Sequence, residues 1–514
     1  MHPLDSSGPG ALACDDDAPL LLVPETVLLP DGPADDHAVV VEGAEFTAVG
    51  PAARLTRDFP QLTAVRLPGT ALLPGFIDAH HHLTQSFGAA LAFGEPSEIF
   101  RRVWVPLESA LDEESAYVAA KLASLEALRG GFTTVADAGT RAPVDVEVVA
   151  SAARDAGLRC VLGQICNDAE PGAESGSSGT AEEISARAEK HLTRYAGDPL
   201  IHPSPAISIP EAATEQTLAA MARLASEAGA VLQIHVNEHL AAVERSLLRH
   251  GLRPLEQLHR LGVLGPHLLA AHATLLTPRE LTLLKDTGTA VSYNPVASAW
   301  KGNAVAPALT MAELGIRFGL GSDGTRGDAF RLLDAAETAQ RLVHGLAGGD
   351  SSCGGGWTWL DHGTRLGAEA VGLGDGAAGN GVRTGVVAAG AAADFLLLDL
   401  TGPEMCPSHD LPWELVRRGN RDQISAVFTA GRLRLWHGWP VTWDGRELVG
   451  RAAELAREVV GRAPVVRVHP PSTQAARHTG RHAGRAEQSA ARTGRRPRTA
   501  AGPGGGHGVP GSSR

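Results

Sequence analysis

The 514-residue chain lacks several features that would place it in other protein classes. No apolar run reaches the roughly 18–20 residues that a membrane-spanning helix requires. The five cysteines form no C-x-x-C pair, so neither a disulfide framework nor a cysteine-based zinc site is indicated. Aromatic residues make up only 4% of the chain, which predicts a core of smaller aliphatic side chains. The first residues contain no basic stretch followed by an apolar one, so we expect a cytoplasmic protein without a signal peptide.

Positive charge is scarce over most of the chain and concentrated near its end. The formal net charge is −13, yet the stretch 465–514 carries nine arginines and a single acidic residue, Glu487. An acidic body argues against nucleic acid as the substrate, because phosphate backbones are bound by basic surfaces. The arginine-rich stretch has very few large apolar residues. We therefore predict a disordered basic tail over 465–514, and a disordered N-terminus over 1–19.

From about residue 75, short apolar strands alternate with helical stretches. Helical patterns include 113–131, where apolar residues recur at helical spacing before a Gly-Gly stop. Eight strands alternating with helices predict an α/β fold of the (β/α)8 TIM-like barrel type, with a doubly wound sheet as the alternative. Polar residues at the carboxyl ends of so many strands favour the barrel. The eight strand candidates are 75–82, 132–139, 158–164, 200–208, 230–238, 267–274, 289–295 and 317–323.

Short β-rich runs with glycine turns flank the predicted barrel on both sides. Examples are "HAVVVEGAEFTAVG" before it and "AAGAAADFLLLDL" after it. We predict that both ends of the chain combine into one small composite β-sandwich domain. The predicted organisation is a first part of the β-domain over 20–72, the metal-dependent barrel over 73–370, and a second part of the β-domain with a connecting segment over 371–450.

Three consecutive histidines end the first predicted barrel strand, in "PGFIDAHHHL" at 74–83. Side chains alternate faces along a strand, so His80 and His82 point the same way and His81 points the other way. An H-x-H pair at a strand end can hold one metal ion. Alone, the pair is weak evidence, and a loop accident or a structural pair is the default interpretation.

Later strands carry further ionisable residues at the same end. The fifth ends in "HVNE", with His235 and Glu238; the sixth in "AAHAT", with His272; and the eighth in "GLGSDG", with Asp323. Taken singly, a core histidine or a turn cap would explain such a residue. A barrel gathers the carboxyl ends of its strands at one face, so their joint occurrence predicts an active site. Three imidazoles and one carboxylate suit Zn(II) or Fe(II) and leave a position open for water.

Five motifs occur in a fixed order along the chain: "LLPGFIDAHHHL", "GFTTVADAG", "HVNE", "AAHAT" and "GLGSDG". In this order and spacing they resemble the amidohydrolase superfamily, most closely its cytosine deaminase and triazine hydrolase branch, over about residues 20–450. The resemblance implies that one divalent metal is held by four residues, which are His80, His82, His235 and Asp323. It also implies that Glu238 shuttles protons and that His272 contacts the hydrolytic water or the substrate. Asp323 would double as the base that receives the water proton.

Binuclear members of that superfamily use a carboxylated lysine on the fourth strand. The chain has only four lysines, Lys121, Lys190, Lys285 and Lys301. None of them lies in the fourth strand candidate, 200–208. The resemblance therefore implies a mononuclear site.

The segment after the seventh strand departs from the family pattern. Family members often carry a HCPxSN-like run there, whereas this chain reads "YNPVASAWKGN" at 293–303. Trp300 could stack on a planar ring and Lys301 could meet an anionic group of a substrate. Gln85 could reach a substrate from the first loop. The alternative is that all three are ordinary loop residues.

These observations lead to three hypotheses about function. The leading one is an enzyme that deaminates an aminated N-heterocycle, of purine, pyrimidine, pterin or triazine type, through a metal-bound hydroxide. Glu238 and His272 form the pair needed to deliver protons to a poor leaving group. The alternative is hydrolytic dechlorination, opening of a cyclic amide, or hydrolysis of another C–N bond. The third, a non-catalytic assembly module, is disfavoured because every ligand position is filled.

The expected partner is a small-molecule substrate, with neither nucleic acid nor a membrane as partner. The sequence leaves open the identity of the substrate, the choice between zinc and iron, and whether the chain forms a homo-oligomer.

Overall fold

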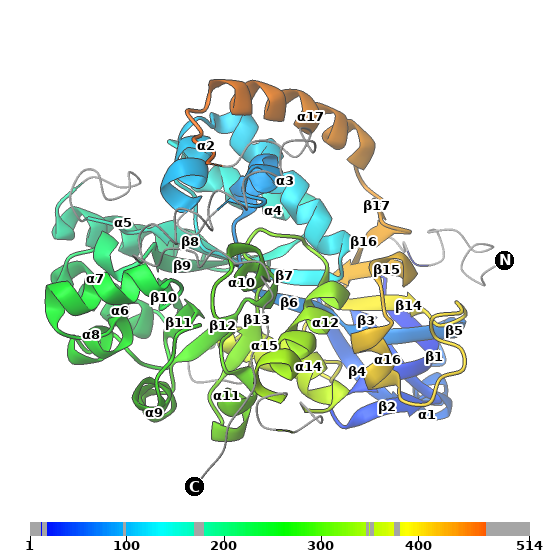
Figure 1. Ribbon diagram of the computed structural model, residues 1–514. Coiled ribbons are helices and arrows are strands. Elements are labelled where there is room, and N and C mark those ends of the chain that lie inside the picture. Colours follow the sequence, from blue (N-terminus) through cyan, green and yellow to red (C-terminus); the bar gives the residue numbers. More distant parts are fainter. Residues whose placement is uncertain are drawn as a thin grey trace, which may run out of the picture. The chain divides into compact units, whose positions relative to one another are not determined.

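The computed structural model describes residue 12 and residues 18–95, 99–168, 179–345, 349, 354–374 and 381–468. The two termini predicted to be disordered fall largely outside these ranges, because 1–11, 13–17 and 469–514 are not described. The described chain forms two β-sheets, and helices surround the larger body built on one of them (Figure 1). Among the described residues, none of the helices combines the length and hydrophobicity that a membrane crossing demands.

Eight parallel strands form one sheet, in which neighbours along the chain are neighbours in space. The last strand lies beside the first, and just beyond it the Asp323 N–H donates to the His80 carbonyl at 2.8 Å. The sheet is therefore a nearly closed barrel, which confirms the predicted fold, and each strand coincides with its predicted position. The strands are β6 (Phe76–His81), β7 (Phe132–Asp137), β8 (Arg159–Ile165), β9 (Ile201–Ile207), β10 (Leu232–Val236), β11 (Leu268–His272), β12 (Ala290–Tyr293) and β13 (Phe318–Leu320).

The barrel strands are apolar along their length and polar at their carboxyl ends. Every residue of β7 and β11 is buried, as expected for parallel strands covered on both faces. Asp137 ends β7 and His272 ends β11. Ionisable side chains are thus gathered at the rim where barrel active sites lie.

Helices connect successive barrel strands (Figure 1). The first long one, α3 (Glu113–Arg129), begins at a capping box between Asp112 and Ser115 and ends at Gly130, as the Gly-Gly stop predicts. The others along the barrel are α2 (Val105–Ser109), α4 (Glu147–Ala156), α5 (Ala181–Arg194), α6 (Glu215–Glu227), α7 (Leu240–His250), α8 (Pro254–Arg260), α9 (Pro278–Thr287), α10 (Pro295–Lys301), α11 (Ala308–Leu314), α12 (Ala329–Gln340), α14 (Gly356–Gly363) and α15 (Arg365–Ala370). Short helical turns are η2 (Leu83–Leu91), η3 (Phe100–Trp104), η4 (Pro210–Ala212) and η5 (Arg341–Gly345).

Strands from both ends of the chain pair in a second sheet of nine strands. The two sets meet where β5 runs antiparallel to β14, with Leu73 opposite Leu396. The N-terminal strands are β1 (Leu20–Leu29), β2 (Gly32–Asp35), β3 (His37–Glu42), β4 (Glu45–Pro51) and β5 (Ala64–Pro74). The C-terminal ones are β14 (Phe395–Asp399), β15 (Ile424–Thr429), β16 (Arg432–Trp436) and β17 (Trp439–Pro440), with α1 (Ala52–Asp58), α16 (Leu411–Arg417) and η6 (Arg421–Gln423) beside them.

The second sheet curls over a core of its own. β4 and β14 are separated by three strands in the sheet order, yet the rings of Phe46 and Phe395 lie 5.5 Å apart. The Phe46 N–H also donates to the Ala391 carbonyl at 2.9 Å. This packing confirms the small β-unit built from both chain ends. The residue boundaries assigned to the domains remain a proposal.

A buried ion pair joins the barrel to the second sheet. Arg159, the first residue of β8, donates from Nε to Asp394 Oδ2 at 2.8 Å and from Nη2 to Oδ1 at 3.1 Å. Asp394 also accepts from the Thr384 hydroxyl at 2.7 Å and from the Ala430 N–H at 2.6 Å. With its carboxylate fully hydrogen-bonded, Asp394 fixes the start of β14 against the barrel.

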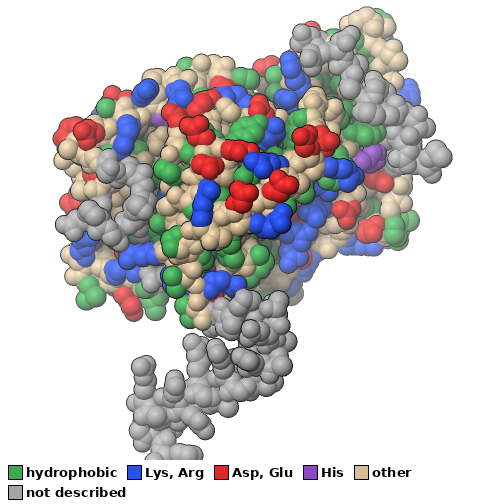
Figure 2. All heavy atoms as spheres, turned by 90° about the horizontal axis from the view of Figure 1, so that it is seen from above, with side chains coloured by type: hydrophobic (Ala, Val, Ile, Leu, Met, Phe, Trp, Pro, Cys, Tyr) green, Lys and Arg blue, Asp and Glu red, His purple; other side chains and the backbone are tan. Residues whose placement is uncertain are grey.

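The last helix, α17 (Gly445–Arg462), packs on α3. Arg451 pairs with Glu114 at 2.6 Å and Arg462 with Asp112 at 3.1 Å. Figure 2 shows this face of the molecule, where acidic and basic side chains are interspersed. Exposed pairs of this kind add little stability, so the apolar side of α17 holds it in place.

Candidate active site and metal centre

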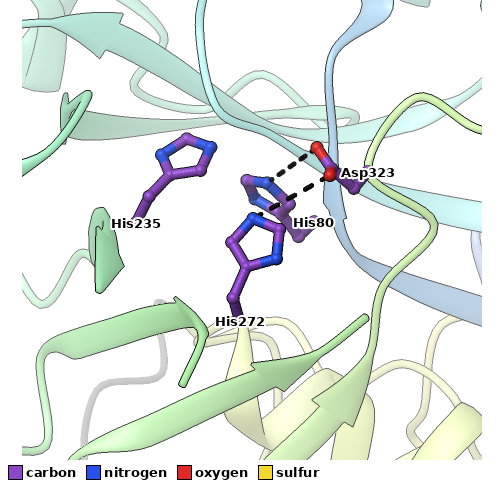
Figure 3. A group of neighbouring side chains, drawn as sticks. All are labelled: His80, His235, His272 and Asp323. Atoms are coloured by element: carbon purple, nitrogen blue, oxygen red, sulfur yellow. Dashed lines mark ion pairs between the residues drawn. The ribbon is translucent and has the colours of Figure 1, made fainter. Parts of the chain in front are cut away.

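Four of the predicted site residues converge at the carboxyl ends of four barrel strands. His80 comes from β6, His235 from β10, His272 from the last residue of β11, and Asp323 from the loop after β13. One ligand atom from each of the four lies within 4.8 Å of the others. Figure 3 shows His80 and His272 directed at Asp323, with Nε2–oxygen distances of 3.4 and 3.9 Å. The four side chains therefore surround a space of the size that one metal ion occupies.

The second histidine of the H-x-H pair closes the cluster from another side. His82 Nε2 lies 3.3 Å from His235 Nε2 and 3.5 Å from Asp323 Oδ1. Burial, together with the nearby His80 imidazole, lowers the pKa of both His82 and His235 well below 6.5. These imidazoles are neutral at physiological pH, which is the form that binds metal.

Several polar atoms of the cluster are buried without a hydrogen-bond partner among the described residues. They include Nε2 of His80 and Nε2 of His272. A buried polar atom left without a partner costs about 1–3 kcal/mol. The donor set of imidazoles and one carboxylate fits a divalent metal with a water, which would satisfy these atoms.

His81 points away from the cluster, as strand alternation predicts. Its Nδ1 lies 2.7 Å from the Ser322 hydroxyl, which donates to Asp78 Oδ2 at 2.5 Å. Burial acts to lower the pKa of His81, but the hydrogen bond and charge of Asp78 outweigh it and raise that pKa. This contact ties β6 to the loop that carries Asp323.

Two of the clustered residues have strained backbones. His272 and Asp323 have φ angles of 74° and 53°, in the left-handed region that residues other than glycine rarely adopt. Each such residue costs on the order of 1–3 kcal/mol, and such strain gathers at functional sites. Here it turns both side chains from the strand direction into the shared space.

Asn294 sets the proton position on His272. The amide oxygen of Asn294 accepts from the Ser292 hydroxyl at 2.8 Å, so its Nδ2 faces His272 Nδ1 at 3.2 Å. Nδ1 thus acts as an acceptor and the ring proton sits on Nε2. Burial lowers the pKa of His272 to about 4, so the ring is neutral. His272 can donate one hydrogen bond into the site, which suits contact with water or substrate better than metal ligation.

Glu238 lies beside the cluster and is linked to it by Lys301. The ammonium of Lys301 is 2.7 Å from Glu238 Oε1 and 2.7 Å from Asp323 Oδ2. Glu238 Oε2 is 3.8 Å from His272 Nε2. Burial acts to raise the pKa of Glu238, but His272 and Lys301 outweigh it and hold that pKa well below 4.5. Glu238 is therefore a carboxylate at rest.

A pocket opens over the cluster and reaches His82, His235, Glu238 and Asp323. Gln85 and Lys301 line it, as predicted for substrate contacts. Trp300 lines a smaller adjoining hollow, where its ring lies 4.4 Å from that of Phe93. Other residues lining the main pocket include Trp104, Arg141, Ser208 and His239.

The structure brings in site residues that the sequence did not single out. Asn294 directly follows β12, so the rule used for the other strand ends would have found it. Arg141 is buried between Glu108, at 3.0 Å, and Ser208, at 2.9 Å. It follows β7 by a loop, and nothing local in the sequence marks it as part of the pocket.

Comparison with known proteins agrees with this site. Residues 71–434 match the amidohydrolase family model. The chain belongs to the amidohydrolase family. This confirms the resemblance carried by the strand-end motifs.

Curated relatives of this amidohydrolase align over most of their length. It is 32% identical over 447 residues to a 5-methylthioadenosine/S-adenosylhomocysteine deaminase of Syntrophobacter fumaroxidans, covering 86% of this chain and 98% of the relative. It is 28% identical over 392 residues to a 5'-deoxyadenosine deaminase of Methanopyrus kandleri, covering 76% of this chain and 86% of that protein.

Solved structures share the fold of this amidohydrolase. An adenosine deaminase from Xanthomonas campestris with bound zinc superposes with a TM-score of 0.77 at 26% identity, over 86% of this chain and 98% of that one. A triazine hydrolase from Arthobacter aurescens superposes with a TM-score of 0.75 at 20% identity, over 85% and 99% of the two chains. At that identity the second comparison supports the fold alone.

Proposed function

We propose that this amidohydrolase is a metal-dependent deaminase that acts on the adenine ring of a nucleoside. One observation carries the proposal: Glu238 lines the pocket over the histidine–aspartate cluster, and its Oε2 lies 3.8 Å from Nε2 of His272. This is the arrangement needed to activate water and to protonate a leaving amine. The relatives named as adenosine-type deaminases favour the adenine ring over other aminated heterocycles.

His80, His82, His235 and Asp323 would hold the metal, which the zinc-bound relative suggests is zinc. When bound, a divalent metal lowers the pKa of water and makes it a nucleophile at neutral pH. No lysine lies on β9, the fourth barrel strand, so we expect one metal per chain.

Asp323 and His272 would act on the attacking water and on the carbon that it attacks. The carboxylate of Asp323 reaches the shared space with both oxygens and can accept the water proton. His272 donates from Nε2 into the same space, where it stabilises the oxygen that becomes negative as the tetrahedral carbon forms.

Glu238 would move the protons that the leaving group needs. As a carboxylate at rest, it takes up a proton released during attack and passes it to the ring nitrogen. The second water proton, which Asp323 has accepted, then passes through Glu238 to the amine, which leaves as ammonia. Gln85 and Lys301 would contact the substrate from the pocket wall, with Trp300 in the adjoining hollow.

The test is ammonia release from a panel of compounds by zinc-loaded protein. The panel contains adenosine, 5'-deoxyadenosine, 5-methylthioadenosine, S-adenosylhomocysteine, guanine, cytosine and aminotriazines. We expect release from the adenine nucleosides, and a loss of at least about 100-fold in kcat for Glu238→Gln with zinc retained. Glu244→Gln is the matched control, because Glu244 is exposed on α7, six residues away.

Two results would contradict the proposal. A zinc-loaded Glu238→Gln variant of undiminished activity would remove Glu238 from the mechanism. Release of chloride from a chlorotriazine, or a ring-opened acid from a cyclic amide, without ammonia from any amine, would favour the alternative hydrolysis at the same site.

We further propose that the enzyme acts in the cytoplasm on a small molecule, with neither nucleic acid nor a membrane as partner. Assembly into a homo-oligomer stays a prediction. The domain division also stays a proposal, with a barrel over 73–370 between β-domain parts over 20–72 and 371–450.

A further inference from the structure

We propose that His239, the residue after Glu238, is a positioning residue that stands doubly protonated and holds the Glu238 carboxylate in place for proton transfer. The inference rests on the proposed deamination. His239 Nε2 lies 3.2 Å from Glu238 Oε2. His239 Nδ1 lies 3.1 Å from Asn303 Oδ1.

Both ring nitrogens of His239 therefore face oxygen acceptors. The amide of Asn303 is oriented by Glu238, because Nδ2 of Asn303 faces Glu238 Oε1 at 3.5 Å and the opposite orientation would set two oxygens against each other. A histidine whose two nitrogens both face acceptors must donate from both, which makes it an imidazolium. Glu238, His239 and Asn303 thus form a closed ring, in which each side chain contacts the other two.

The local sequence does not call for histidine at this position. His239 is the N-cap residue of α7, where Ser, Thr, Asp or Asn usually bonds the first free N–H groups of a helix. His239 makes no such side-chain bond and instead lines the pocket beside Glu238. A residue that is unusual at a helix N-cap and that faces a functional carboxylate is expected to have a role in the site.

The charges around His239 set the direction of its titration. Burial lowers the pKa of His239, the hydrogen bond and charge of Glu238 raise it more strongly, and Lys301 on α10 lowers it, with a raised pKa as the net result. Glu211 of η4 and Arg245 of α7 line the same pocket and pair with each other at 2.9 Å. His239 is thus charged below its raised pKa and neutral above it, where the positive charge beside Glu238 and one of the two ring donors are lost.

The first measurement follows the His239 imidazole by NMR in zinc-loaded, histidine-labelled protein without substrate, with His239→Gln assigning the signal. We expect a pKa above 6.5 that falls in Glu238→Gln and in Asn303→Leu and rises further in Asn303→Asp. A His239 pKa at or below 6.5 in the parent, or one that none of these variants moves, overturns the inference.

The second measurement is the pH profile of kcat and KM on the adenine nucleoside that is turned over. His239→Ala should lose about tenfold in kcat with little change in KM, because a charged hydrogen-bond donor to the acid is missing. The Gln side chain of His239→Gln can donate a hydrogen bond but does not titrate. This variant should keep most of kcat, and its kcat should not fall at alkaline pH as that of the parent does. A His239→Gln profile identical to that of the parent would contradict the inference.

The two measurements separate this inference from the proposed function. The NMR titration needs no substrate, so it stands or fails even if no nucleoside is deaminated. If the protein deaminates a nucleoside while the pKa of His239 is not raised, the proposed function stands and only the positioning role of His239 is removed. His259→Gln is the matched control, since His259 is exposed on α8, and melting curves with zinc content show that each variant is folded and loaded.

Discussion

Lys301 lies against Asp323, with its ammonium 2.7 Å from a carboxylate oxygen of the candidate metal site. It is the last residue of α10, and Gly302 ends that helix with a φ of 67°. The lysine side chain is 14% exposed, so its charge is largely shielded from water. One protein cation is thereby shared by two carboxylates, those of Asp323 and Glu238.

Lys301→Met should destabilise the metal-free protein more than the zinc-loaded one. Removing one partner of a buried ion pair costs about 3–5 kcal/mol, because the remaining charge is left uncompensated. A bound divalent metal compensates the charge of Asp323 instead. Zinc should therefore narrow the difference in stability between Lys301→Met and the parent. Thermal melts in chelator and in zinc check this, with Lys285→Met, exposed on α9, as the control. Equal destabilisation in both states would show that Lys301 acts through packing alone.

Metal content should separate the ligands from the residue that contacts water. His82→Ala and His235→Ala should bind far less than one zinc per chain, since each removes an imidazole that faces the shared space. His272→Gln should keep its zinc and lose activity, because its Nε2 carries the proton and cannot ligate. Elemental analysis after gel filtration gives the stoichiometry. Loss of zinc from His272→Gln would make His272 a ligand instead.

Gln85 should affect substrate binding and Trp300 should not. Gln85 is buried in the pocket wall, so Gln85→Leu should raise KM by about tenfold through loss of a hydrogen bond to the substrate. Trp300 packs against Phe93 in the adjoining hollow, so Trp300→Phe should change KM less than about twofold. Steady-state kinetics on one nucleoside compare the two variants. If Trp300→Phe raised KM more than Gln85→Leu did, the substrate ring would be placed at Trp300.

The ion pair between Arg159 and Asp394 should make stability depend on pH in the acid range. Burial acts to raise the pKa of Asp394, but Arg159 outweighs it and holds that pKa below 3.8. A depressed folded-state pKa stabilises the protein above about pH 3.8, and that contribution is lost as pH falls through the folded value. Denaturant unfolding should show Asp394→Asn less stable by about 3 kcal/mol at pH 7, with the difference shrinking below pH 3.8.

Asp58→Asn is the control for the buried pair, because Asp58 is exposed and pairs with the exposed Arg57 at 3.3 Å. Its substitution should change the free energy of unfolding by less than about 0.5 kcal/mol. A pH-independent difference between Asp394→Asn and the parent would mean that the aspartate contributes through shape and not through charge.

The sequence was sufficient to predict the barrel and the ring of ligand candidates. Strand alternation separated His80 and His82 from His81, and the common end of parallel strands brought in His235 and Asp323. These rules depend only on the periodicity of the strands and on the closure of the sheet.

Contacts made from the loops were beyond such rules. Lys301, at the end of α10, reaches two carboxylates that follow other strands, Glu238 after β10 and Asp323 after β13. The frame of His239 and Asn303 around Glu238 joins residues 64 positions apart. Neither periodicity nor local propensity specifies where such side chains meet, although a histidine at a helix N-cap was a signal that could have been noticed.

The pairing of β5 with β14 makes completion of the second sheet a late event in synthesis. β5 runs almost directly into β6, the strand that carries His80, and its hydrogen-bonded neighbour on one side is not made until Asp399 has been translated. Pairing of such distant segments is slow because the intervening chain must first be brought into place. A nascent chain that stalls before β14 would display an unpaired edge of β5 beside the barrel strand that carries His80, and such an edge is a target for chaperones and proteases.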